Sequence, residues 1–155
     1  MIVSRSADYA LRALLYLTRF ASSSRFVPAN EISNQMHTPP FLLSRILQRL
    51  VKSGMLNSMK GHHGGFRLST NPTEITVHDV VRVIDGPIVV HDCSAQTCDL
   101  GPNCTLRDAF TNAERAVEMA LRAVTLAELT QRQAQPQQAV RANFGMPPRA
   151  DRGVD

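Results

Sequence analysis

The chain has 155 residues, of which 43% are hydrophobic and 5% aromatic, and its formal net charge is +4. This length suits one ordinary domain, or a small domain with an attached arm. The apolar content is sufficient for a hydrophobic core, which excludes a fully disordered chain. The positive charge leans toward an acidic partner such as DNA, although many proteins of this charge bind none. No signal peptide is visible and no apolar run approaches the ~20 residues of a membrane span, so we expect a cytoplasmic protein that does not contact a membrane.

Three amphipathic segments open the chain. Apolar side chains recur at helical spacing over about residues 7–20, a shorter helix is indicated over 29–36, and a third is predicted over about 41–52. The core face of the first helix is expected to carry Leu11, Leu14, Leu15 and Thr18. A tight link at residues 37–38 should leave Thr38 as N-cap of the third helix. Two short helices with a tight turn are typical of a helix-turn-helix, but two packed helices with a solvated polar face share this pattern.

The third helix has two different faces, and a hairpin is predicted to follow it. Its core face should be formed by Leu43, Ile46, Leu47 and Leu50. Its outer face carries cationic, amide and hydroxyl groups, from Ser44, Arg45, Gln48, Arg49 and Lys52. Two strands over about 55–59 and 66–69 flank a glycine-rich turn, which suits a tight reversal. A hairpin in this place is a wing, so we predict a winged helix-turn-helix.

The DNA contacts that we expect lie on the third helix and on the wing. Base edges in the groove should be contacted by Ser44, Arg45 and Gln48. Phosphates should be contacted by Arg49 and Lys52 on the helix, by Lys60, His62 and His63 in the wing, and by Arg5 near the first helix. Alternatively, the two histidines are metal ligands or residues of the wing tip without a binding role. The last interpretation is favoured, because adjacent histidines seldom chelate one metal well.

The second half of the chain is predicted to be helical around one loop. The spacing of Thr76 and Asp79 is that of a capping box, and Gly86-Pro87 should end the helix that follows. From Thr105 a 3/4 repeat runs for about 18 residues, through Leu106, Phe110, Ala113, Val117, Ala120 or Leu121, and Val124. A helix this long has no obvious partner in a small winged domain, so it predicts a homodimer formed by helix pairing. The alternative is a helix folded back on its own domain.

These elements give a mainly α fold with a small β-hairpin: a winged helix-turn-helix domain plus a long C-terminal dimerisation helix. The expected division is a DNA-binding domain over 1–85, a cysteine loop over 86–104, and the dimerisation helix with a short terminal helix over 105–130. The terminal helix should begin near Thr125. Residues 131–155 are rich in Gln, Pro, Ala and Arg and are predicted to be a disordered tail.

All three cysteines, Cys93, Cys98 and Cys104, lie in the stretch HDCSAQTCDLGPNC. Three thiols cannot all pair as disulfides, and they are one short of a four-thiolate metal site. With His91 they could form a structural zinc site, although the paired C-x2-C spacing of such sites is absent; two of them could also form a redox disulfide. No catalytic motif is present, so we expect no enzyme, and a ferredoxin-type carrier would need a fourth cysteine.

Several stretches together resemble the bacterial IscR/NsrR family of winged-helix regulators, over about residues 1–130. The stretches are SADYALRALLYL, FLLSRILQRLVKSGML, KGHHGGFRL, VVRVIDGP, the three spaced cysteines and TLAEL. The resemblance implies a homodimeric transcription factor, acting as a repressor on a double-stranded DNA operator. It also implies an iron–sulfur cluster on Cys93, Cys98 and Cys104. The four-iron (4Fe–4S) form is slightly preferred, and the two-iron (2Fe–2S) form stays open because three cysteines and one oxygen ligand can serve either. The cluster would respond to nitric oxide, redox state or iron supply, and its loss would loosen operator binding.

The fourth ligand of such a cluster is open. IscR-like members supply a histidine three residues after the last cysteine, where this chain has Arg107, which cannot ligate in its charged form. The resemblance is closer to the NsrR-like branch, which implies ligation by Asp8 of the partner subunit. Asp8 is also a residue that a helix N-terminus favours without any metal. His91 is a local competitor, and solvent or a small thiol could take the position instead.

Overall fold

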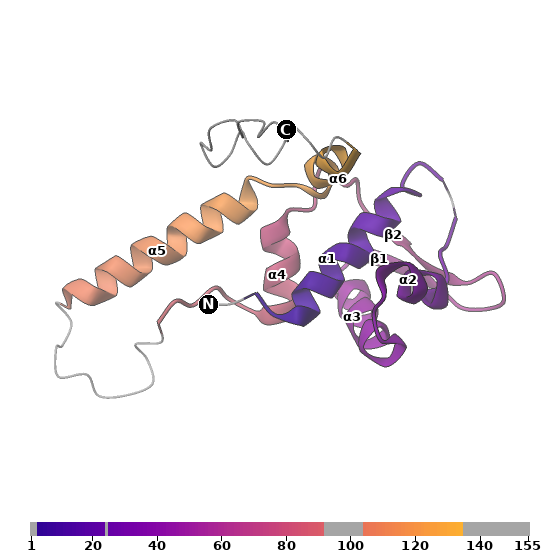
Figure 1. Ribbon diagram of the computed structural model, residues 1–155, viewed down its shortest axis with the longest axis horizontal. Helices are drawn as coiled ribbons and strands as arrows, with labels where there is room; N and C mark the ends of the chain where they lie inside the picture. The colour runs from indigo at the N-terminus through magenta and orange to yellow at the C-terminus, as the bar shows by residue number, and fades with distance from the viewer. Residues whose placement is uncertain (1–2, 24, 92–103, 135–155) are drawn as a thin grey trace, which may run out of the picture.

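The computed structural model describes residues 3–23, 25–91 and 104–134. Within them the elements are α1 (Arg5–Thr18), α2 (Ala29–Met36), α3 (Pro40–Lys52), β1 (Leu56–Met59), β2 (Gly65–Leu68), α4 (Val77–Asp85), α5 (Thr105–Arg122) and α6 (Leu126–Ala134). Figure 1 shows α1 to α4, the hairpin and α6 gathered together, while α5 extends away from them. The predicted fold class is confirmed: a mainly helical chain with one small antiparallel hairpin.

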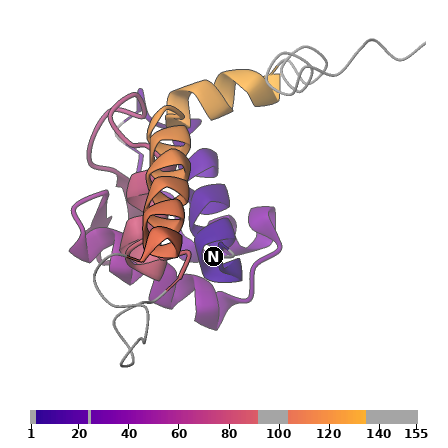
Figure 2. The same cartoon turned by 90° about the vertical axis from the view of Figure 1, so that its left-hand side faces the viewer.

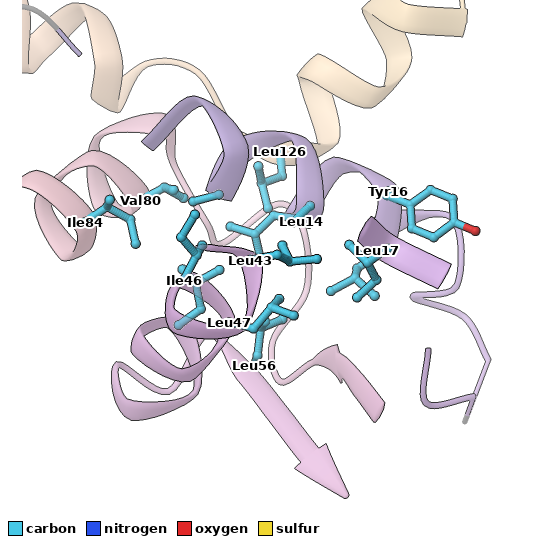
Figure 3. Close-up of a cluster of buried hydrophobic side chains, with 14 of the residues drawn as sticks. Leu14, Tyr16, Leu17, Leu43, Ile46, Leu47, Leu56, Val80, Ile84 and Leu126 are labelled. Carbon is cyan, nitrogen blue, oxygen red and sulfur yellow. The ribbon is translucent and has the colours of Figure 1, made fainter. Parts of the chain in front are cut away.

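Helix α1 is the centre of the core. It packs against α2, α3, α4 and α6, and its buried residues are Ala7, Ala10, Ala13, Leu14, Tyr16 and Leu17. Figure 3 shows Leu14 and Leu17 among core residues of the other elements, with Leu126 of α6 above them. Leu11 and Leu15 of the predicted core face are half-buried and pack against this core, and Thr18 is half-buried. The prediction missed the fully buried alanines. A helix enclosed on several sides uses small alanines for close approach, so its leucines alone do not mark the buried face.

The turn between α2 and α3 is tight, as predicted. His37 adopts the left-handed conformation, with φ 48° and ψ 41°, and the buried Ser33 hydroxyl donates to the carbonyl of Thr38 at 2.7 Å. The prediction that Thr38 is the N-cap of α3 was wrong. Thr38 is buried, and its hydroxyl donates to the Met36 carbonyl at 3.3 Å. Pro39 takes the N-cap position, and Pro40 begins the helix. Proline suits this position because it has no N–H to leave unpaired.

The hairpin is anchored to the chain before α2. Leu56 pairs with Leu68 and Met59 with Gly65, in antiparallel register. A separate bridge joins Phe66 to Val27, with N–H···O distances of 2.9 Å in both directions. Gly65 has φ +150° and a Cβ there would collide with the Val27 backbone, so this position requires glycine. The wing is thereby fixed beside the helix-turn-helix.

Helices α4 and α6 are both capped as their sequences predict. Thr76 and Asp79 form a complete capping box at α4, and Gly86 ends that helix with φ +87°. At α6, the Glu128 N–H donates to the Thr125 hydroxyl and the Thr125 N–H donates to the Glu128 carboxylate. Both contacts measure 3.2 Å. The two caps lie side by side, because Thr76 and Thr125 form a β-bridge.

Helix α6 packs onto α1. Leu126 is fully buried, and the Thr130 hydroxyl lies 2.9 Å from that of Thr18. The helix runs to Ala134, so residues 131–134, expected in the tail, are helical; the rest of the predicted tail lies outside the described residues. None of the helices described is long and apolar enough to span a membrane.

The capping box makes the stability of α4 depend on pH. Burial alone raises the pKa of Asp79, but hydrogen bonds from the Thr76 hydroxyl and N–H, together with the nearby His78 ring, outweigh it and lower the pKa. A carboxyl with a lowered pKa stabilises the fold above its unfolded pKa of about 4, and this contribution is lost as the pH falls through the folded value. Asp79→Ala should therefore cost about 1 kcal/mol at pH 7.

The measurement is urea unfolding of wild type and variant from pH 7 to pH 3. The difference in unfolding free energy should shrink below about pH 4. Glu74→Ala, which removes an exposed loop carboxylate, should show a much smaller difference. A difference for Asp79→Ala that stayed constant across the range would contradict a role for the carboxylate charge.

Candidate nucleic-acid interface and metal centre

Helix α3 presents the two faces that its sequence predicts. Leu43, Ile46, Leu47 and Leu50 are buried. The polar residues predicted to contact DNA from this helix, namely Ser44, Arg45, Gln48, Arg49 and Lys52, are all exposed. Figure 1 places α3 at the edge of the molecule, opposite α6 across α1. The recognition helix of a winged helix-turn-helix must be accessible in this way to enter a groove.

A groove of about 540 Å³ lies between α3 and the wing. Its lining includes Gln48 and Lys52 from the helix, Lys60 from the wing and the backbone of Gly64 and Gly65. The structure thus brings together three residues that the sequence predicts as DNA contacts. Apolar side chains, among them Val51, Met59 and Phe66, line the same hollow.

Other predicted contacts take different positions. Arg49 donates from its guanidinium to the Val83 carbonyl of α4 at 3.0 Å, so it ties α3 to α4. His62 and His63 lie on the wing with ring centroids 5.3 Å apart, and line a separate hollow of about 420 Å³ with Arg25. Arg5 is exposed at the first position of α1 and lines neither hollow. Of the predicted DNA contacts, three therefore line the α3–wing groove and the two histidines line the second hollow, while Ser44, Arg45, Arg49 and Arg5 line neither.

Phe41 is a surface residue that the sequence analysis missed. It lies in the first turn of α3 and is 77% exposed, and the Arg45 guanidinium lies over its ring at 5.9 Å from the centroid. The signal in the sequence is its position: Phe41 is four residues before Arg45 and outside the apolar repeat that begins at Leu43.

Cys104 is the one predicted cluster ligand of the loop that falls within the described residues; Cys93 and Cys98 lie outside them. Its thiol is free and half-buried, and the residue is the N-cap of α5. Thiolate is the form that binds iron, so Cys104 fits an iron–sulfur ligand by its chemistry. Among the described residues no three His, Cys, Asp or Glu side chains form a metal site.

Asp8 lies in the first turn of α1 and is about half exposed. Both of its carboxylate oxygens bind Arg12, at 3.0 Å and 2.9 Å. The start of α1 is also tied to the end of α4, because the Ser4 N–H donates to the Asp85 carboxylate at 2.9 Å. In Figure 1 the first residues of α5 lie at the end of the molecule remote from α1.

His91 lies beside α5. Its ring packs on Phe110, with centroids 4.9 Å apart. The preceding residue, Val90, donates its N–H to the Glu114 carboxylate at 2.8 Å. Phe110 follows Cys104 by six residues, or about 9 Å along the helix. The segment that enters the cysteine loop thus runs along the helix that leaves it.

His78 is a buried polar group at the junction of α4 and α5. It is 2% exposed, and neither ring nitrogen has a hydrogen-bond partner. Carboxylate oxygens of Asp79 and Glu118 lie 3.6 Å and 3.8 Å from these nitrogens. The imidazole ring of His78 thus lies between two carboxylates, one from α4 and one from α5.

Comparisons with known proteins agree with this geometry. The Rrf2 family, described as "Iron-dependent Transcriptional regulator", matches residues 3–132. CymR of B. subtilis, a global cysteine regulator, is 22% identical with a TM-score of 0.70, over 84% of this chain and 97% of that one. IscR of T. potens is 22% identical with a TM-score of 0.71, over 90% and 93%. Oxidised CymR of Staphylococcus aureus is 20% identical with a TM-score of 0.69, over 84% and 97%.

The structural matches are below 25% identity, and they support the winged-helix fold. The family match covers most of the chain, including α3, the wing and α5. The chain therefore belongs to the Rrf2 family of transcriptional regulators.

Proposed function

We propose that this chain is a homodimeric repressor that binds a DNA operator and reports nitric oxide, redox state or iron supply through an iron–sulfur cluster. The observation that carries the proposal is the position of Cys104: this free cysteine is the N-cap residue of α5, and the helix leads back to the winged domain. Helix α5 would thus connect the cluster ligand Cys104 to the domain that carries the DNA-binding surface. Membership of a family of iron-dependent regulators supports this assignment.

The DNA-binding half of the proposal rests on the groove between α3 and the wing. Gln48 can pair with a base edge, while Lys52 and Lys60 supply positive charge on the two sides of the same hollow. Arg45 and Ser44 extend this surface along the exposed face of α3. Arg49 contributes differently: by bonding the Val83 carbonyl it fixes the angle between the recognition helix and α4.

The sensing half rests on the donor set. Cys93, Cys98 and Cys104 would hold the cluster, preferably a four-iron one, and Asp8 of the partner subunit would complete it. The bound cluster supplies iron and sulfide that nitric oxide or oxygen can attack. Arg12 holds both carboxylate oxygens of Asp8, and a ligating carboxylate is commonly oriented by such a hydrogen-bond partner. His91, packed on Phe110, is the candidate ligand from the same chain.

The dimer would form through the outer face of α5. Phe110, Val117 and Leu121 are half-buried and face their own domain, whereas a second stripe at heptad spacing is fully exposed. That stripe consists of Leu106, Ala109, Ala113, Ala116, Ala120 and Ala123. Met119 lies next to it and is 71% exposed. Small residues at this spacing allow two helices to approach closely, so a second α5 is the occupant that we propose.

A second candidate keeps the regulator and changes the sensor. CymR of Staphylococcus aureus has been observed in an oxidised form, and CymR of B. subtilis is a cysteine regulator. The three cysteines could likewise act as a thiol redox switch, or bind zinc with His91. The free thiol of Cys104 at a helix N-terminus suits either chemistry. Metal and sulfide content distinguishes these from an iron–sulfur cluster.

Lys60→Ala should weaken binding to every DNA duplex by a similar factor, because a phosphate contact carries no sequence information. The slope of log affinity against log salt concentration should fall by about 0.9 for each wing engaged. Arg132→Ala on α6, across α1 from α3 in Figure 1, removes the same charge and should leave the slope unchanged. An unchanged slope for Lys60→Ala, measured by fluorescence anisotropy, would show that the wing does not reach the backbone.

Ala116→Glu should prevent dimerisation, because it places a charge in the middle of the exposed stripe on α5. Sedimentation equilibrium should give a dimer for wild type and a monomer for the variant at micromolar concentration. Thr70→Glu, an exposed position after the hairpin, adds the same charge and should remain dimeric. A dimeric Ala116→Glu protein would place the interface elsewhere.

Anaerobic reconstitution with iron and sulfide should give a coloured protein in which both elements are bound, at about four of each per chain for the preferred cluster. Cys104→Ala should abolish the colour, and Asp8→Ala should yield a cluster that decays faster in oxygen. His91→Ala is the matched test of the local ligand and should decay as wild type does. Colourless, zinc-loaded protein, or equal operator affinity for holo protein, apo protein and Cys98→Ala, would overturn the iron–sulfur assignment.

A further inference from the structure

The start of α3 has an apolar tip that the proposed function leaves unexplained. Pro39, Pro40 and Phe41 are consecutive and all exposed. Phe41, at 77%, is the most exposed of the large apolar side chains described. Because the core face of α3 begins at Leu43, Phe41 lies outside the buried stripe. An aromatic ring kept in water forgoes the stabilisation that burial would provide, so its exposure calls for a partner.

Phe41 and Arg45 form a pair on the outer face of the helix. They are four residues apart, which brings their side chains together, and the guanidinium carbon lies 5.9 Å from the ring centroid. A cation over an aromatic ring is attracted to its face. The contact restricts the orientations of Arg45, which would otherwise be a flexible side chain. The aromatic group and the guanidinium are therefore presented as one unit.

The surroundings of this unit favour DNA as its partner. Gln48 and Lys52 continue the same exposed face, and the first turn of α3 has no acidic residue. Residues near the N-terminus of a recognition helix are the ones that reach base edges. In the major groove the thymine C5-methyl group is the apolar feature, and guanine O6 and N7 accept the two parallel hydrogen bonds that arginine donates. An apolar protein partner would not require the cationic flank.

We propose that Phe41 is a specificity residue that contacts a thymine methyl group, while Arg45 binds a guanine in the adjacent base pair. The inference rests on the proposed function and deepens it by naming what α3 reads: a thymine next to a guanine in each half-site. Phe41 supplies discrimination through contact area, and Arg45 through hydrogen bonds. Because the two side chains stack, recognition of the thymine by Phe41 and of the guanine by Arg45 should depend on each other.

The test begins with an operator selected by the cluster-loaded wild-type protein from a random duplex library. Each thymine of that operator is then replaced by deoxyuridine, which removes the methyl group and keeps the pairing. We expect one position per half-site, beside a guanine, at which the replacement weakens binding, by roughly fourfold for each methyl group lost. At the other thymines the affinity should stay the same.

Protein variants assign the effect to Phe41. With Phe41→Ala the thymine and deoxyuridine operators should bind equally, whereas Phe41→Leu should retain part of the difference. Arg45→Ala should reduce the preference for the neighbouring guanine and also narrow the thymine–deoxyuridine difference. Val89→Ala, a matched exposed apolar control outside α3, should keep the full difference. Thermal unfolding by circular dichroism checks that each variant is folded.

Several results would overturn the inference. Deoxyuridine could have no effect at any position, or Phe41→Ala could keep the full discrimination. Phe41→Ala could also weaken all duplexes alike, which would make the ring a spacer, or weaken none, which would make the tip a docking site for another protein. If the wild-type protein selected no sequence from the library, the proposed function itself would fail, and the inference with it.

Discussion

The attachment of α4 is the constraint on which the rest of the structure depends. Its first turn is closed by the Thr76–Asp79 capping box and bridged to Thr125. Its last residue, Asp85, accepts hydrogen bonds from Ser4 at the start of α1. Between these ends the Val83 carbonyl accepts a hydrogen bond from Arg49 of α3. One short helix therefore sets the positions of the recognition helix, the first helix and the chain that enters the cysteine loop.

Helix α5 is the least complete part of this arrangement. It has 18 residues and none is fully buried, although it contacts α4 along its inner side, as Figure 2 shows in end view. Propensity alone gives a helix in water only marginal stability, so burial of its second face is what would stabilise it. Leu106 is 55% exposed on that face, together with the alanine stripe. In the proposed dimer a second copy of α5 would cover this face.

How much of the structure could be predicted from the sequence depended on how many faces each element buries. Helix α3 buries one, so its repeat at Leu43 and Leu47 predicted the correct orientation. Helix α1 is enclosed by four helices, and the leucine pattern there missed Ala10 and Ala13. For α5 the predicted repeat included residues of two different faces: Phe110 is half-buried on the inner face, whereas Ala113 is exposed on the outer face. The proposed metal site would depend on loop closure and on a second subunit, and local periodicity encodes neither.

Helix α5 is fixed at its C-terminal end, so a small rotation there displaces its N-terminal end. Its C-terminal end is fixed to the winged domain, where the Val77 N–H donates to the Val124 carbonyl at 2.9 Å. Toward its N-terminal end, α5 is joined to the rest of the chain by the His78–Glu118 pair, the Val90–Glu114 hydrogen bond and the packing of His91 on Phe110. The helix is about 27 Å long, so a change of a few degrees at the fixed end moves the free end by an ångström or more. Conversely, thiolates bound to a metal cluster near the N-terminal end of α5 would fix the angle between α5 and α4. The hydrogen bond from Arg49 to the Val83 carbonyl would then relate this angle to the position of α3.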